Sequence, residues 1–187
     1  MTNIRCVVAA VGSCLALAAP AWGQSNIDAE ADPVNWLKAY LGGAACVVYE
    51  VGPSGFRLEH VTENTEVQFD GCRMVLQQAS VTGAHSELRT FRIALAALDT
   101  NAVTSSEGFP LPEGWTSRGD VPTHTITIRA SAGKPVIEEQ VDPLDGGTPR
   151  SYQTDVVTLL VRHEENASQI VRALTRVIEM CRTGSSR

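Results

Sequence analysis

The amphipathic segment at residues 164–182 constrains the fold more than any other part of the chain. Its apolar residues recur every three or four positions, which places them on one face of a helix: Ala167, Ile170, Val171, Leu174, Val177, Ile178 and Cys181. Arg172, Arg176 and Glu179 fall on the opposite side of that helix. Full burial of the five large apolar side chains would stabilise the fold by roughly 8–15 kcal/mol at most. A helix with so apolar a face needs a sheet to pack against.

Several strand-like segments precede this helix and supply that sheet. Segments 88–98 and 123–130 alternate apolar and polar side chains, which is the pattern of a strand with one buried face. Asp70-Gly71 forms either a hairpin turn or a glycine bulge within one long bent strand. Hairpin-length links between the segments favour antiparallel pairing. The strands expected from the sequence cover residues 45–51, 56–61, 65–69, 72–81, 88–98, 123–130, 135–141 and 155–162.

A short helix is expected before the first strand, at residues 34–41. Asp32 is a good N-cap, Pro33 a good first helical residue, and Gly42-Gly43 a good stop. The sequence therefore predicts the α+β class: a bent antiparallel sheet or open barrel of about seven strands, closed by a C-terminal α-helix, with a short N-terminal helix. We assign residues 33–183 to a single globular domain and residues 184–187 to a disordered tail.

The order of these elements resembles the pleckstrin-homology-like superfold, a bent antiparallel sheet or open barrel closed by a C-terminal helix. The resemblance covers roughly residues 44–182 and rests on element order and on the passage from Val156 to Cys181. The runs Phe69-Asp70-Gly71-Cys72 and Ile178-Glu179-Met180-Cys181 also look like uncharacterised exported bacterial proteins of this layout. Because the superfold hosts many unrelated functions, the resemblance implies a fold and no activity. The turn at residues 52–55 has no lysine, so the resemblance does not extend to phosphoinositide binding.

The first residues have the pattern of a secretory signal peptide, at residues 1–23. Residues 1–5 carry one positive charge, residues 6–19 form a short apolar run, and Ala21-Trp22-Gly23 places small residues where a signal peptidase cuts. We expect cleavage after Gly23, with Ala21 as the alternative, and a flexible mature N-terminus at residues 24–32. The apolar run is too short to span a bilayer comfortably, and an uncleaved anchor is the alternative interpretation. The pattern predicts a periplasmic or secreted protein with no transmembrane segment in the mature chain.

Removal of this leader leaves three cysteines, Cys46, Cys72 and Cys181. An oxidising compartment permits one intramolecular disulfide among them and leaves one cysteine over. We favour Cys72 with Cys181, because Cys181 lies on the apolar helix face and Cys72 begins an apolar strand-like run. Cys46 with Cys181 is the alternative, and either bridge closes a long loop worth roughly 4–5 kcal/mol in the chain-entropy model. Three reduced thiols in the core are the third possibility.

Charge and motif content argue against several classes of function. The formal net charge is −6 and the basic residues are scattered, whereas nucleic acid and anionic membrane surfaces require clustered Lys and Arg. The run His163-Glu164-Glu165 begins like a zinc-protease helix, but Ala167 occupies the second ligand position. The chain contains no Gly-x-Ser-x-Gly elbow and no phosphate-binding loop with a lysine. We therefore assign no catalytic, metal-binding or cofactor-binding residue and expect no cofactor.

The polar stretch at residues 100–122 is the candidate interaction loop, because long loops often carry function. It holds three large apolar side chains that either tuck into the core or form an exposed contact: Phe109, Leu111 and Trp115. We predict a non-enzymatic exported domain that binds a protein, a peptide or an envelope component through this loop or through a sheet edge. A small periplasmic hydrolase is the alternative, with His124 beside a carboxylate such as Asp120 or Glu138. A third possibility is that the unpaired cysteine links two copies of the chain.

Overall fold

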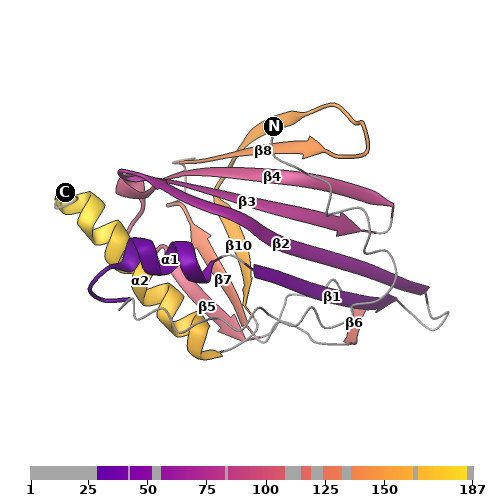
Figure 1. Ribbon diagram of the computed structural model, residues 1–187, viewed down its shortest axis with the longest axis horizontal. Helices are drawn as coiled ribbons and strands as arrows, with labels where there is room; N and C mark the ends of the chain where they lie inside the picture. Colours follow the sequence, from indigo (N-terminus) through magenta and orange to yellow (C-terminus); the bar gives the residue numbers. More distant parts are fainter. Residues whose placement is uncertain are drawn as a thin grey trace.

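The computed structural model describes residues 29–41, 43–51, 56–82, 84–107, 115–118, 124–131, 136–161 and 164–184. Over these residues the chain forms two antiparallel β-sheets, a short N-terminal helix and a long C-terminal helix, with no closed barrel (Figure 1). The predicted α+β class is therefore confirmed. The expected signal peptide at residues 1–23 and the last three residues of the expected tail lie outside the described residues.

The larger sheet contains seven of the described strands, in the order β6-β1-β2-β3-β4-β8-β9, and all neighbours are antiparallel. These strands are β1 (Gly43–Val51), β2 (Phe56–Asp70), β3 (Arg73–Thr82), β4 (His85–Ala94), β6 (Trp115–Arg118), β8 (Ile137–Pro143) and β9 (Arg150–Thr154). β2 joins two segments predicted as separate strands, with a register shift between Asn64 and Glu66. A hairpin turn follows β2, and its Gly71 has φ of 55°, a left-handed conformation that favours glycine.

The smaller sheet contains three described strands, in the order β10-β7-β5. These are β10 (Val156–Val161), β7 (His124–Arg129) and β5 (Val103–Glu107). The sequence predicted one bent sheet or open barrel, and the structure divides the strands between two sheets because the chain leaves the larger sheet after β4. There the 3₁₀ turn η1 (Leu95–Ala97) replaces the end of the predicted strand, and the Leu95 N–H donates to the Cys72 carbonyl at 2.9 Å. Leu95 is fully buried, so the core holds this turn in place.

The C-terminal helix α2 (Glu164–Thr183) packs its apolar face into the core, as the sequence predicted. Leu174 and Ile178 are fully buried, whereas Arg172 on the opposite side is exposed. The helix contacts α1 (Pro33–Tyr40), η1 and the smaller sheet, and Figure 1 shows it beside α1 at one end of the molecule. In the same view the long strands of the larger sheet run from that end to the opposite side of the molecule. Neither of the described helices is long and apolar enough to cross a membrane.

The helix α1 begins as predicted, with Asp32 as its N-cap and Pro33 as its first residue. The Asp32 carboxylate accepts hydrogen bonds from the backbone N–H of Asn35 at 3.2 Å and from its side-chain amide at 2.7 Å. Trp36 stacks on Tyr40 with 4.3 Å between ring centroids, and Trp36 is buried. The capped turn and the aromatic pair therefore fix α1 against the core beside α2.

A disulfide joins Cys72 and Cys181, whose Cα atoms are 5.5 Å apart. This is the pair that the sequence favoured. The bridge connects the turn between β2 and β3 to the last turns of α2, across 109 residues of sequence. Next to it, the Arg182 guanidinium donates to the Leu98 carbonyl and to the Asp99 carboxylate, each at 3.1 Å. The disulfide therefore holds the end of α2 against the turn between β2 and β3, and Arg182 holds it against the segment that follows β4.

Candidate functional site

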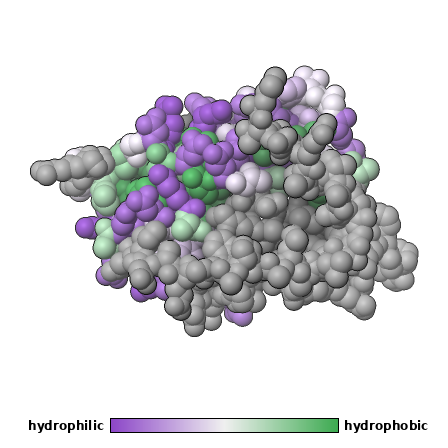
Figure 2. All heavy atoms as spheres, in the orientation of Figure 1, coloured by the Kyte–Doolittle hydropathy of each residue, from purple (hydrophilic) through white to green (hydrophobic). Residues whose placement is uncertain are grey.

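The hairpin formed by β8 and β9 carries the exposed large hydrophobic side chains of the described residues. Leu144 in its turn is 43% exposed and Tyr152 on β9 is 45% exposed. In Figure 2 the described residues at the top of the view, where Figure 1 places this hairpin, are mainly hydrophilic or of intermediate hydropathy. Isolated apolar side chains are common on protein surfaces, but both of these fall on one hairpin that also ends a sheet.

The strand β9 lies at the edge of the larger sheet. Among the described strands it pairs with β8 alone, and its side chains from Arg150 to Gln153 are all exposed. Alternate N–H and C=O groups of an edge strand point away from the sheet and are available to another chain. Neither proline nor lysine interrupts β9, so two of the common devices that protect a sheet edge are missing from it.

The rest of the sheet sets the position of this hairpin. β8 pairs along its whole length with β4, and the Leu144 N–H continues that ladder by donating to the Ser86 carbonyl at 2.8 Å. Ile137 and Val141 are fully buried on the side of β8 that faces the core. In the connecting turn Gly146 has φ of 93°, which residues with a side chain rarely adopt. Core packing and turn geometry therefore present the β9 edge in a defined orientation.

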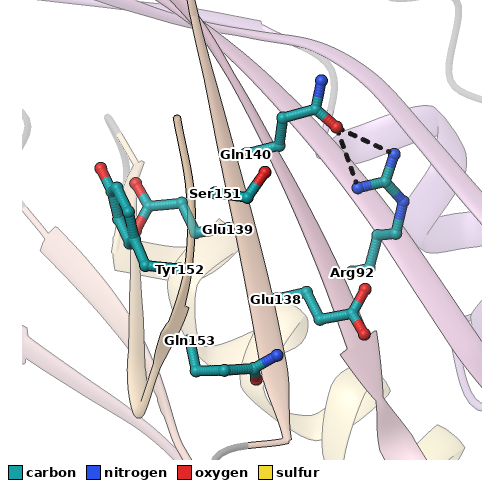
Figure 3. A pocket seen from close by; sticks show the side chains of 7 residues that line it. All are labelled: Arg92, Glu138, Glu139, Gln140, Ser151, Tyr152 and Gln153. Atoms are coloured by element: carbon teal, nitrogen blue, oxygen red, sulfur yellow. Dashed lines mark hydrogen bonds between the residues drawn. The ribbon is translucent and has the colours of Figure 1, made fainter. Parts of the chain in front are cut away.

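A hollow of about 300 Å³ lies beside the hairpin, and Figure 3 shows the side chains that line it. Glu139 and Tyr152 reach it from the side of the sheet that faces the core. The other lining residues share the outer face, because directly opposed residues of an antiparallel sheet point to the same side: Arg92, Glu138, Gln140, Ser151 and Gln153. The hollow is therefore polar and borders the edge of β9 that pairs with no other described strand.

The outer face carries a short chain of hydrogen-bonded side chains that does not include the Glu138 carboxylate. The Arg92 guanidinium donates twice to the side-chain oxygen of Gln140, each time at 3.4 Å. The amide nitrogen of Gln140 donates in turn to the two Asp142 carboxylate oxygens, at 2.9 and 3.1 Å. Glu138 is exposed and makes no ion pair or side-chain hydrogen bond with any described residue. Glu138 is therefore the one charged group of this outer face that has no hydrogen-bond or ion-pair partner among the described residues.

The opposite face of β8 carries a buried carboxyl group. Glu139 is 7% exposed, and its Oε1 lies 3.4 Å from the Arg89 guanidinium, which also donates from Nε to Glu87 at 2.6 Å. Burial raises the pKa of Glu139 above its usual value, while Arg89 opposes this shift and the Glu87 carboxylate reinforces it. Gln78 and Ser80, which lie opposite Arg89 and Glu87 on β3, are also buried. The inward face of the sheet therefore carries buried polar side chains near the hairpin, beside the apolar Val141.

A second hollow, of about 440 Å³, lies where β4 and β9 begin. Its lining includes His85, Asp145, Thr148 and Arg150. The His85 Nδ1 atom lies 3.3 Å from Asp145 Oδ2, and 88% of the histidine side chain is exposed. Water screens so exposed a pair, and such pairs hold their partners weakly. We regard this hollow as a solvated depression of the surface.

The predicted interaction loop at residues 100–122 contains two strands that the sequence did not predict, β5 and β6. β6 begins at Trp115, which pairs with Val51 of β1, and the first residue of β5, Val103, is buried in the core. Phe109 and Leu111 lie outside the described residues, as does the side chain of Trp115. The expectation of a long stretch without secondary structure was therefore wrong, because strand pairing draws parts of it into both sheets.

The residues of the hydrolase alternative are not brought together among the described residues. His124 begins β7 and lies directly opposite Glu107 of β5, in the smaller sheet. Glu138 lies in the larger sheet, and Asp120 lies outside the described residues. Neither of the two hollows includes His124. No hydrogen bond joins His124 to a carboxylate among the described residues, and the hydrolase alternative stays a prediction.

The strand β9 and its exposed Tyr152 were not predicted from the sequence. The strand has five residues, and at least four of them are exposed, so burial imposes no apolar–polar alternation on it. An aromatic residue between polar neighbours, just after a turn-forming run, was the one available signal. Pairing with β8, which no local pattern encodes, makes this segment a strand.

No group of three or more His, Cys, Asp or Glu side chains is placed to hold a metal ion within the described residues. Cys46 belongs to β1 and its side chain is not described, so the cross-linking hypothesis stays a prediction. The resemblance to the pleckstrin-homology-like superfold also stays a prediction. Comparison of the chain with protein-family models, curated proteins and solved structures finds no match.

Proposed function

We propose that this protein is an exported, non-enzymatic binding domain that recognises an extended segment of a partner protein or peptide at the β9 edge. One observation carries the proposal: β9 ends the larger sheet, is exposed, and pairs with β8 alone among the described strands. Tyr152 on this strand and Leu144 in the adjoining turn offer apolar contact beside the open edge.

Strand addition suits this edge, because main-chain hydrogen bonds supply affinity and neighbouring hollows supply selectivity. An added strand would continue the ladder of β4, β8 and β9. Its side chains would alternate between the face of Tyr152 and the outer-face hollow beside Ser151 and Gln153. Tyrosine favours such a contact, since its large ring can be buried while its hydroxyl group stays in water.

Two features support export of the protein. The disulfide between Cys72 and Cys181 is typical of oxidising compartments, where such bridges form and persist. The signal-peptide pattern at residues 1–23 agrees with the same location. Together they favour the periplasm or the extracellular space as the place where the partner is met.

A peptide-display selection against the purified protein tests the proposal. We expect the selected peptides to protect amide hydrogens of Arg150–Thr154 from exchange, because new main-chain hydrogen bonds form there. We also expect methylation of one alternate set of peptide nitrogens to abolish binding and methylation of the other set to preserve it, since only one edge of the added strand faces β9.

Substitutions on two edge strands provide the matched control. Tyr152→Lys is expected to weaken the selected peptides about tenfold or more, because the aromatic contact beside the edge is lost. Ser105→Lys places the same charge on β5, an exposed edge strand of the smaller sheet, and is expected to leave binding unchanged. Protection located on β5, or equal tolerance of both methylation patterns, would overturn the proposal.

A further inference from the structure

We infer that the strand accepted by β9 is basic, with lysine or arginine at the alternate positions that pass over the outer-face hollow, where Glu138 binds the cation. This inference rests on the proposed function and names the chemistry of the partner. It begins with the charges on the outer face of β4, β8 and β9, which are Arg92, Glu138 and Asp142. Gln140 links Arg92 to Asp142 through the two ends of its amide, so the Glu138 carboxylate alone lacks a described partner.

The register of the hairpin places this carboxylate within reach of an added strand. Glu138 lies directly opposite Gln153, and Figure 3 shows both side chains on the same side of the hairpin. A strand added to β9 would lie about 4.8 Å beyond it and about 9.6 Å from β8. Its residue opposite Gln153 would point to the same outer face. A long lysine or arginine side chain can cross over Gln153 to Glu138, whereas a short cationic side chain cannot.

Two further charge arguments favour a cation in this position. Arg92 lies directly opposite Glu138 on β4, but its guanidinium turns toward Gln140 in Figure 3 and makes no ion pair with the carboxylate. The whole chain carries a formal net charge of −6, which attracts a basic segment during encounter and repels an acidic one. A hydrogen bond from a lysine or arginine to the ionised Glu138 would also be stronger than one from a neutral side chain.

A series of four synthetic peptides tests the inference. Each has nine residues and alternates threonine with one test residue: lysine, glutamine, glutamate or 2,3-diaminopropionic acid. Binding to the purified protein is measured by calorimetry and located by amide exchange. We expect the lysine peptide to bind about tenfold more tightly than the glutamine peptide, and the glutamate peptide to bind most weakly. In mildly acidic buffer, where its side-chain amine is protonated, the diaminopropionic acid peptide carries the positive charge on a shorter stem, so we expect it to bind no better than the glutamine peptide there.

Two protein variants complete the test. Glu138→Gln is expected to reduce the preference for lysine over glutamine to within about twofold. Glu107→Gln removes the same charge from an exposed position on the edge strand β5 and is expected to keep the full preference. Equal binding of the lysine and diaminopropionic acid peptides, a lysine preference that survives Glu138→Gln, or no binding of the lysine peptide at millimolar concentration would overturn the basic-strand inference.

The two proposals fail in different ways. Peptides that protect β9 without any preference for charge would remove the basic-strand inference and leave strand addition at this edge intact. Selected peptides that bind elsewhere, with β9 unprotected, would remove both.

Discussion

The two ends of the larger sheet differ in what their inward-facing side chains contact. On β3, Met74 and Leu76 are fully buried in the apolar core near the helices, whereas Gln78 and Ser80 occupy the next inward positions along the same strand. On β8 the inward face also turns polar after the apolar Ile137, but at Glu139 alone, because the next inward residue is the buried Val141. The comparison shows that alternation along a strand identifies its inward face, while the residue types on that face show which end the apolar core occupies.

The helix end concentrates stabilising contacts, whereas the hairpin end exposes apolar side chains and a strand edge. At the helix end, Cys72 is bonded to Cys181, and α2 buries its apolar face. At the hairpin end, Leu144 and Tyr152 are exposed and β9 leaves one edge open among the described strands. Substitutions at the two ends should therefore separate folding from binding.

The disulfide is expected to give the largest effect. Replacement of both Cys72 and Cys181 by serine removes a bridge across 109 residues and is expected to lower the free energy of unfolding by about 5 kcal/mol. Urea denaturation under non-reducing conditions measures the change. Cys46→Ser is the control, because it leaves this bridge intact. A similar fall in the free energy of unfolding of the Cys46→Ser variant would show that Cys46, rather than Cys72, is bonded to Cys181.

Truncation of one leucine at each end tests the comparison directly. Leu174→Ala is expected to lower the free energy of unfolding by about 2–5 kcal/mol, because its side chain is fully buried and leaves a cavity. Leu144→Ala removes the same atoms from a side chain that is 43% exposed, and the expected change is within about 0.5 kcal/mol. Chemical denaturation of both variants measures the difference. Similar losses in the two variants would contradict the division of the sheet into two ends.

The smallest expected effect is a pH dependence at Glu139. Burial raises the pKa of its carboxyl group, so the native state holds this proton more tightly than the unfolded chain does. The resulting stabilisation is fully present below the pKa of the unfolded chain and is lost as the pH rises through the raised native pKa. We therefore expect Glu139→Gln to have a higher free energy of unfolding than the wild type at a pH above the raised native pKa. In acid, where the wild-type carboxyl group is protonated, we expect the two free energies to approach each other.

Urea denaturation at a series of pH values, from about 4 to about 8, checks this profile. Glu138→Gln removes a carboxyl group from the exposed face of the same strand and controls for the change in net charge. Arg89 keeps Glu87 as a partner in the Glu139→Gln variant, so the substitution does not leave a buried cation unpaired. A Glu139→Gln variant that is less stable than the wild type at neutral pH, with the difference again closing in acid, would show that the attraction of Arg89 outweighs the cost of burial.

Elements with a strong local signal were predicted from the sequence. The spacing of Leu174 and Ile178 predicted α2, Asp32 and Pro33 predicted the start of α1, and the position of Cys181 on the apolar helix face favoured the observed disulfide. For the candidate site, the sequence predicted binding at a sheet edge without identifying the strand. It gave Glu138 only as a possible partner of His124. Pairing partners far along the chain decide which strand forms the edge, and no local pattern records them.

The sequence by itself determined the α+β class, the helix faces and their caps, because these depend on residue spacing within a few turns of chain. Only the tertiary structure decided that the strands form two sheets and that β9 ends the larger one. The physical reason is that strand pairing joins residues far apart in the chain. Its hydrogen bonds are made by backbone groups, which do not depend on the side chain, so the local sequence does not record the partner. Side chains at β9 stay in water, so no burial pattern marks this edge in the sequence.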